Sequence, residues 1–118
     1  MQLEERDVVR LRDMLLWSRK AIFMLGQRSF DELLANEEKR LALVRCIEVI
    51  GEAGHDVSPA VKDTLPQVPW PAMYGMRNRL IHDYGNTNYK VVHDVVTNDL
   101  PGLASILASF LAKHGHAV

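Results

Sequence analysis

The sequence predicts an all-α fold, an up-and-down helical bundle of four to five main helices with short extra helices, in a single domain over residues 1–118. Apolar residues recur at spacings of three, four and seven along most of the chain, which is the period of an amphipathic helix. Capping residues, glycines and prolines mark the ends of these segments. Val91-Val92 and Val95-Val96 repeat at four rather than two, so residues 89–98 favour a helix over a strand.

The first long helix is expected over residues 3–25, and Gly26 ends it. Its apolar face is wide, because two stripes lie side by side. One holds Val8, Leu11, Leu15, Ile22 and Leu25, and the other holds Met14, Trp17, Ala21 and Met24. We also expect Trp70 in the core or at an interface, and Phe23, Phe30 and Phe110 in the core.

Local capping signals predict three more helix starts. Ser29 and Glu32 form a capping box that opens a short helix ending near Asn36. Asn36 itself caps a long helix that reaches about residue 56, with acids in its first turn. Ser58 caps a further short helix that Pro66 ends.

The long helix after Asn36 carries two features with a structural explanation. Gly51 and Gly54 cost up to ~1 kcal/mol each against alanine in a helix interior, which indicates close approach of a neighbouring helix. Arg45, Glu48 and Glu52 share one face and can pair. We expect Glu52 to act mainly as a partner for Arg45.

Two helices complete the expected bundle. The sequence Pro69-Trp70-Pro71 predicts a helix start and Gly85-Asn86 a stop, so that a helix covers residues 70–84. The last helix ends before Gly115, and Pro101 either kinks the preceding helix or opens this one.

Composition and charge narrow the class of protein. The single cysteine, Cys46, excludes an intramolecular disulfide and suits a reducing cytosol. No segment has the pattern of a signal peptide or a membrane span, so we expect a cytoplasmic protein without a membrane partner. The histidines lack metal-site spacing and no phosphate-binding glycine loop is present, so no metal or other cofactor is expected. With a net charge of −1, any RNA must be held by a local patch.

A polar cluster occupies the end of the predicted 70–84 helix, in the stretch Arg77-Asn78-Arg79-Leu80-Ile81-His82-Asp83-Tyr84. Arg77 and His82 would lie about 140° apart around one helix, whereas two copies related by a two-fold axis could bring them together. Arginine offers a charged fork for phosphate oxygens, and histidine exchanges protons near neutral pH. The pair suits metal-free cleavage of RNA by its own 2′-hydroxyl. The residues alone leave open a purely structural network at the helix end.

The stretch resembles the Arg-(Asn/Asp/His)-x3-His-x-Tyr motif of the HEPN superfamily, in particular its HepT-like toxin branch. A chance match to the whole string is expected in roughly one chain in a few thousand. Further segments fall in the order that this family shows, and they span nearly the whole chain: Ile50-Gly51-Glu52-Ala53, Val68-Pro69-Trp70, Gly75-Met76-Arg77-Asn78 and Asp99-Leu100-Pro101.

The resemblance implies the HEPN fold and a metal-independent endoribonuclease toxin of a bacterial or archaeal type VII toxin–antitoxin system, acting on tRNA or mRNA. It assigns catalysis to Arg77 and His82 of both subunits of a homodimer, and a supporting role to Asn78. Arg79 lies outside the motif and is assigned only a contact with substrate. The implied partner is an MntA-like nucleotidyltransferase antitoxin, which forms a hetero-oligomer with the toxin and neutralises it by AMPylation of Tyr84.

A second reading is a non-catalytic, nucleotide-binding or docking subunit of a minimal nucleotidyltransferase, because HEPN proteins include such members. The joint presence of Arg77, Asn78, His82 and Tyr84 favours the enzyme. On a helix over residues 70–84, Tyr84 would share a face with Arg77. Its hydroxyl, with a pKa near ~10, is a poor acid or base at neutral pH and suits a control point.

Overall fold

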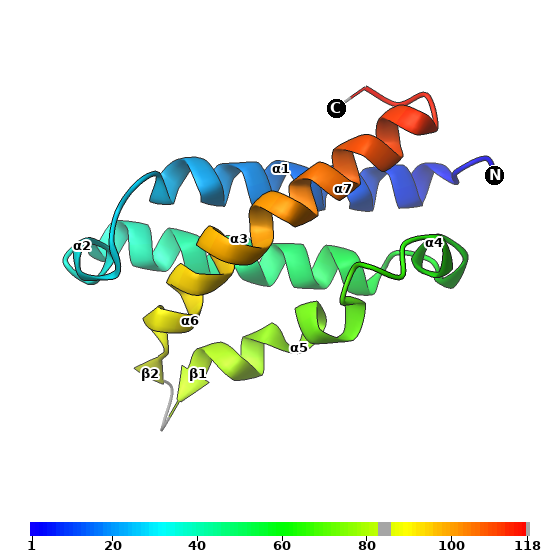
Figure 1. Ribbon diagram of the computed structural model, residues 1–118. Coiled ribbons are helices and arrows are strands. Elements are labelled where there is room, and N and C mark those ends of the chain that lie inside the picture. Colours follow the sequence, from blue (N-terminus) through cyan, green and yellow to red (C-terminus); the bar gives the residue numbers. More distant parts are fainter. Residues whose placement is uncertain (83–85, 118) are drawn as a thin grey trace.

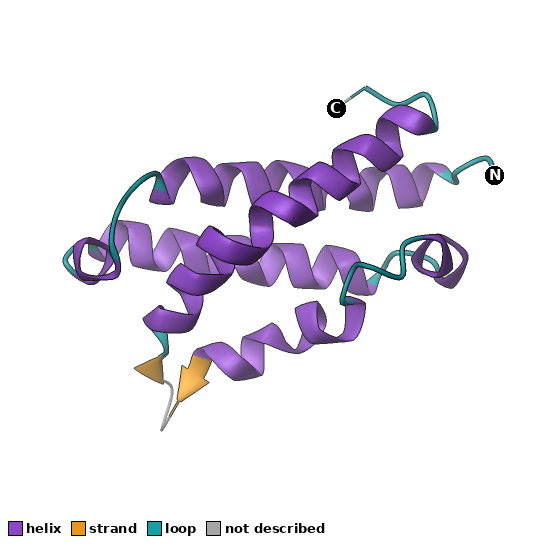
Figure 2. Cartoon of the chain, viewed as in Figure 1, coloured by secondary structure: helices purple, strands orange, loops and turns teal. Residues whose placement is uncertain are grey.

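The computed structural model describes residues 1–82 and 86–117, and it confirms the all-α fold (Figure 1). Helices make up most of the described chain, with one short antiparallel strand pair (Figure 2). The elements are α1 (Glu5–Leu25), α2 (Phe30–Leu34), α3 (Glu37–His55), α4 (Pro59–Thr64), α5 (Trp70–Leu80), β1 (Ile81–His82), β2 (Asn86–Thr87), α6 (Tyr89–Asp94), the π-helix η1 (Val95–Asp99) and α7 (Leu100–Lys113).

Three helices stack in one layer, with α3 between α1 and α5 (Figure 1). The rod formed by α6, η1 and α7 crosses this layer and packs chiefly against α1. The core between them holds fully buried leucines and methionine, among them Leu11, Met14, Leu43, Leu107 and Leu111. α5 therefore lies at the opposite edge of the layer from α1.

The predicted N-terminal caps are all present. Ser29 and Glu32 form the reciprocal capping box, Asn36 accepts a hydrogen bond from the Lys39 N–H, and Ser58 caps α4. Gly26 ends α1 with a φ of 57°, a backbone conformation that residues other than glycine rarely adopt. Asp7 joins α1 to α4, because its buried carboxylate accepts hydrogen bonds from the Ser58 N–H at 2.9 Å and the Ser58 hydroxyl at 2.7 Å.

Pro101 lies in the first turn of α7, so the expectation that it opens the last helix is confirmed, although no loop separates α7 from η1. The helix continues from Tyr89 to Lys113, and its register changes in η1, where the Leu100 N–H bonds to the carbonyl of Val95. A π-turn loosens the backbone just before the proline, which has no N–H to donate. By length and composition this rod is apolar enough to cross a membrane, which the sequence analysis did not anticipate. Its buried residues pack against α1, as in a core helix of a bundle.

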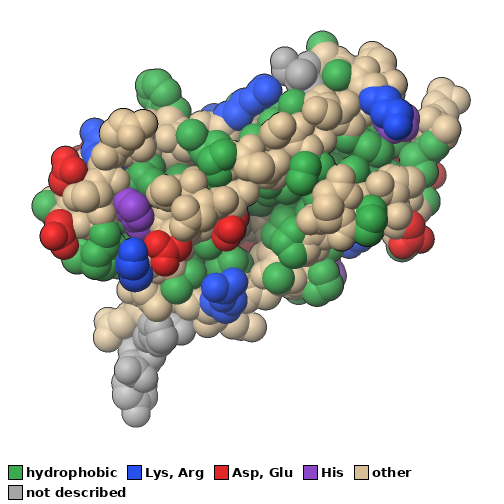
Figure 3. Space-filling model, viewed as in Figure 1, with side chains coloured by type: hydrophobic (Ala, Val, Ile, Leu, Met, Phe, Trp, Pro, Cys, Tyr) green, Lys and Arg blue, Asp and Glu red, His purple; other side chains and the backbone are tan. Residues whose placement is uncertain are grey.

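One aromatic residue was assigned wrongly to the core. Phe23 is 86% exposed, and it continues an outer stripe of α1 with the half-exposed Val9 and Leu16 at spacings of seven. Phe110 is buried as expected, and Trp70 is buried with its indole N–H donating to the Leu65 carbonyl. The face in Figure 3 shows hydrophobic side chains along the boundary between α7 and α5, beside acidic and basic groups. The periodic pattern of α1 was right, but its apolar face is wider than the bundle covers.

Candidate functional site

The polar stretch 77–84 is divided between a helix and a hairpin. α5 ends at Leu80, and the next two residues form β1, in which Ile81 pairs with Thr87 and His82 with Asn86. The Asn88 N–H, eight residues along the chain, donates to the Leu80 carbonyl. In a longer helix this carbonyl would accept a hydrogen bond from within the helix, four residues ahead. The predicted helix over residues 70–84 is therefore too long by about one turn.

This ending changes the expected relation between Arg77 and His82. The 140° separation assumed one continuous helix, and that premise is wrong because His82 lies on a strand. The structure describes only the backbone of His82, and Tyr84 lies outside the described residues. Arg77, Asn78 and Arg79 are all on α5 and are all exposed.

Arg77 lies over a groove between α3 and α5, which we call the Arg77 groove. The groove has a volume of about 450 Å³, and its polar residues are Glu48, Glu52, Tyr74, Arg77 and Asn78. The Arg77 Nε lies 3.9 Å from Glu48 Oε2, and the Arg77 side chain stays 67% exposed. A long ion pair at an exposed site stabilises little, about 0–1 kcal/mol. Most of the guanidinium fork is thus free to meet a ligand.

The depth of the groove is fixed by a backbone contact. A Cβ placed on Gly51 of α3 would lie 2.7 Å from the carbonyl oxygen of Met73 in α5. The close helix approach predicted from the glycines is confirmed, and α5 is the neighbour. Gly54 leaves room for the side chains of Met14 and Met73 in the same way.

Arg79 faces another cavity, because residues two positions apart on an α-helix, such as Arg77 and Arg79, point in directions about 200° apart around the helix axis. This cavity, which we call the Arg79 pocket, lies between α5, η1, α7 and α3. It shares Ile47, Gly51 and Met73 with the Arg77 groove. The two arginines therefore serve opposite sides of α5 and not one site.

The structure reveals a contact that sequence reasoning missed. Glu48 was expected to pair within α3, but it pairs with Arg77 on α5. Arg45 forms no ion pair with any side chain in the described part of the chain, so the expected Arg45–Glu52 pair is wrong. Such i, i+3 and i, i+7 pairs on the helix surface gain too little to hold two long side chains in place. A signal was present in the spacing, since Glu48 precedes Gly51 by about one turn and so flanks the point of closest approach.

Three of the histidines with described side chains have structural contacts. His55 stacks on Tyr74 with ring centroids 3.9 Å apart, which adds an aromatic edge to the Arg77 groove. A ring nitrogen of His93 bonds with the Arg28 carbonyl at 2.9 Å, and one of His114 bonds with the Phe110 carbonyl at 2.9 Å. Among residues with described side chains, no group of three or more His, Cys, Asp or Glu is placed to hold a metal ion.

Comparison with known proteins gives a consistent result. The family model described as "Ribonuclease HepT-like" matches residues 6–110. A Methanocaldococcus jannaschii protein named "Putative RNase" is 36% identical over 91 residues, which cover 77% of this chain and 75% of that protein. A second "Putative RNase" of that organism is 33% identical over 84% of this chain and 92% of its own length.

A third relative, "Probable ribonuclease HepT" of Thermococcus cleftensis, is 34% identical over 63% of this chain and 67% of that protein. No solved structure shows a significant match to the chain. The family match covers most of the chain, including the Arg77 groove and β1, so the chain belongs to the HepT-like ribonuclease family.

Proposed function

We propose that this protein is a metal-independent endoribonuclease that acts as the toxin of a type VII toxin–antitoxin system in the cytoplasm. Its membership of the HepT-like ribonuclease family supports RNA as the substrate. The observation that carries the proposal is the state of Arg77, whose fork is largely exposed at the rim of a groove just before the chain enters β1 with His82. Such a fork matches the oxygens of a phosphodiester.

In the proposed reaction the ribose 2′-oxygen bonds to phosphorus and its proton passes to a base. The bond from phosphorus to the 5′-oxygen breaks, and that oxygen takes up a proton. The products are a 2′,3′-cyclic phosphate and a 5′-hydroxyl. Arg77 binds the non-bridging oxygens as negative charge develops, Asn78 supports it with an amide N–H, and His82 protonates the leaving oxygen.

Glu48 and Glu52 give the groove a mixed charge in the absence of RNA. Arg77 must therefore exchange Glu48 for phosphate when RNA binds. That exchange costs little, because the pair is long and exposed, whereas a bidentate arginine–phosphate contact is charge-assisted and shorter.

A homodimer would bring two copies of the Arg77 groove together and assemble a complete site from both. A mixing experiment tests this, because Arg77→Ala and His82→Ala protomers each lack one group. If the groups act across the interface, mixed dimers regain one intact site and some activity, and each variant alone stays inactive. A monomer by sedimentation that cleaves RNA, or no recovery in dimers shown to be mixed, would rule out the shared site.

The catalytic proposal is tested by cleavage of tRNA and total RNA. Arg77→Ala and His82→Ala should abolish cleavage with unchanged folding, and Arg77→Lys should restore only part of it, because a point charge does not reproduce the fork. Arg6→Ala, an exposed arginine on the distant α1, is the matched control and should cleave normally. Loss of activity in EDTA with recovery in magnesium would contradict a metal-independent reaction.

We also propose that Tyr84 is the control point, modified with AMP by an MntA-like nucleotidyltransferase. The added phosphate would compete with RNA for Arg77, and the adenine would obstruct the groove. Intact-mass measurement after incubation with that partner and ATP tests the assignment. Tyr84→Phe should cleave RNA and escape modification, whereas Tyr89→Phe should still be modified. If Tyr84→Phe still gains the same mass, the modified residue is not Tyr84 and the assignment is wrong.

One observation favours the second candidate, a non-catalytic docking subunit of a nucleotidyltransferase. Arg77 already has an acidic neighbour in Glu48, as an arginine with a structural role would. In that case Glu48→Gln and Arg77→Ala would weaken partner binding alike, and no preparation would cleave RNA.

A further inference from the structure

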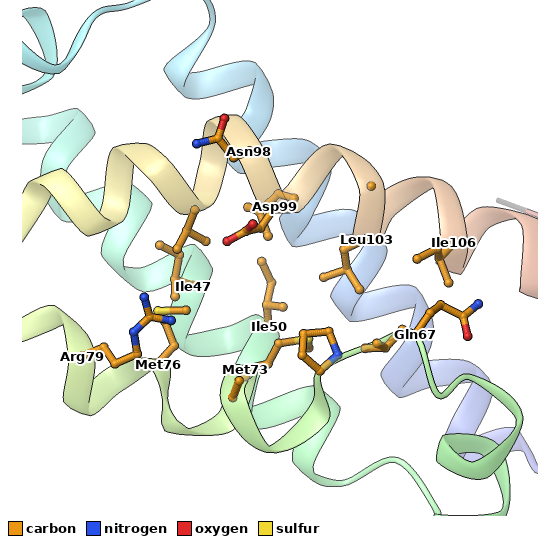
Figure 4. Close-up of a pocket in the computed structure, with 17 residues that line it drawn as sticks. Ile47, Ile50, Gln67, Met73, Met76, Arg79, Asn98, Asp99, Leu103 and Ile106 are labelled. Carbon is orange, nitrogen blue, oxygen red and sulfur yellow. The ribbon is translucent and has the colours of Figure 1, made fainter.

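The Arg79 pocket is a second cavity that the proposed cleavage chemistry does not use. It has a volume of about 340 Å³, near the lower end of the ~300–1,000 Å³ range of small-molecule sites. Its floor is α3, and its walls are α5 on one side and η1 with the start of α7 on the other (Figure 4). Gly102 contributes no side chain at the entrance to α7, and nothing lies within 4 Å of the position its Cβ would take.

The interior of the pocket suits a flat aromatic ring. It is lined by aliphatic side chains and two thioethers, chiefly Ile47, Ile50, Met73, Met76 and Leu103. Thioether sulfurs make favourable contacts with aromatic rings, and methionine adapts its shape to the ligand. A sugar or a free phosphate would find few polar partners on this floor.

Two charged groups reach the pocket from opposite walls. Figure 4 shows Arg79 rising from α5 and the Asp99 carboxylate pointing from η1 toward Ile47 and Ile50, while the Asn98 amide lies on the other side of its helix. Asp99 precedes α7 yet makes no side-chain capping hydrogen bond. Among the described side chains neither Arg79 nor Asp99 belongs to an ion pair. The carboxylate oxygens are therefore available as acceptors.

A carboxylate selects between nucleobases by their edges. It only accepts hydrogen bonds, with two oxygens side by side. Guanine presents two adjacent donors, N1–H and the N2 amino group, on its Watson–Crick edge. Adenine and cytosine present one donor next to an acceptor, and uracil one donor between two acceptors. RNA-binding proteins commonly read unstacked bases on this edge.

We propose that the Arg79 pocket binds a guanine base of the RNA, with Asp99 accepting from its N1–H and N2 amino group and Arg79 contacting the phosphate of the same nucleotide. The pocket and the Arg77 groove flank α5 and share α3 residues, so a strand crossing α5 can place guanine in one and the scissile phosphate in the other. The setting rests on the proposed ribonuclease function, but binding of guanine does not require cleavage.

The test is a titration of the full-length protein with GMP, AMP, CMP and UMP, followed by NMR. GMP should bind about tenfold more tightly than the other three and shift the amide resonances of Gly102 and Leu103. Asp99→Asn, which keeps the shape but replaces one acceptor with a donor, should weaken GMP binding about tenfold. Asp94→Asn is the matched control, because it makes the same change one turn and a half earlier on the same rod, outside the pocket, and should bind as the wild type does.

Equal affinity for all four nucleotides, preference for AMP, or GMP binding unaffected by Asp99→Asn would overturn the proposal. Because mononucleotides are not cleaved, this result is independent of catalysis. If GMP binding depends on Asp99 but the protein cleaves no RNA, the guanine pocket stands and the proposed ribonuclease function is wrong. If the wild type cleaves RNA, His82→Ala does not, and no guanine preference is seen in nucleotide binding, the ribonuclease function stands and the guanine pocket is wrong.

Discussion

Gly51 offers a direct test of how the site is built, because its substitution should oppose an ordinary rule. Replacing a glycine inside a helix with alanine normally stabilises it by about 0.8–1.0 kcal/mol. At Gly51 the new methyl group would lie 2.7 Å from the Met73 carbonyl oxygen. That atom belongs to the backbone of α5, so no side-chain rotation relieves the overlap and the helix must move.

Gly75→Ala supplies the reference. Gly75 is inside α5, and nothing lies within 4 Å of the position of its Cβ. Both variants share the gain in helix propensity, so their difference isolates the contact. Overpacking a tight site costs about 1–3 kcal/mol. We therefore expect Gly75→Ala to stabilise the protein by up to ~1 kcal/mol and Gly51→Ala to destabilise it by up to ~2 kcal/mol, so that the two variants differ by about 1–3 kcal/mol.

Thermal unfolding monitored by circular dichroism measures both changes. For a domain of this size ~1 kcal/mol moves Tm by roughly 3–6 °C, so opposite shifts of the two variants are readily separated. Gly51→Ala should also lose RNA cleavage at temperatures where it is folded, because displacing α5 moves Arg77 away from α3. Similar shifts of the same sign in both variants would refute the close approach of α3 and α5.

Three further outcomes follow from described contacts. Asp7→Ala should lower the free energy of unfolding by about 1–3 kcal/mol in urea titrations, because it leaves the Ser58 N–H and hydroxyl without their buried acceptor, and a loss below ~0.5 kcal/mol would contradict that role. Burial raises the pKa of the Cys46 thiol, so Ellman's reagent at pH 8 should react with it only as fast as the protein opens, and stability should decline as pH rises above about 9, a decline that Cys46→Ala should lessen. The hydrogen bond from the Ser29 backbone N–H, and to a lesser extent that with the Ser29 side chain, lowers the pKa of Glu32. The stability from this capping box is therefore present at neutral pH and is lost as pH falls through that lowered pKa. Glu32→Gln should reduce the loss of stability at acid pH, and an unchanged acid limb of the stability–pH curve would contradict the capping box.

The helix starts could be predicted from the sequence because their causes are local. Ser29, Asn36 and Ser58 cap helices through side chains that reach three residues along the chain. The end of α5 was missed because its cause is distant, namely the Asn88 N–H that takes the Leu80 carbonyl and the pairing of β1 with β2. The residues of 81–84 could continue a helix, so nothing local marks the stop.

The same distinction holds for the candidate site. The motif located Arg77, but its partner Glu48 lies on another helix, and only the packing of α3 on α5 shows which acid it meets. Phe23 illustrates the limit on the core, since a periodic stripe indicates which residues share a face but not how much of that face a neighbour covers.

The position of α5 at the edge of the layer has a consequence for how the protein loses activity. α5 packs mainly on α3, whereas α1, α3 and the α6–η1–α7 rod enclose the larger part of the core. An edge element with few neighbours can open in a sub-global step whose free energy is below that of complete unfolding. Cooperative melting would then report on the inner helices and not on Arg77. Amide hydrogen exchange along α5 measures the free energy of this local opening. A variant that melts at the wild-type temperature can still spend more of its time with α5 detached from α3.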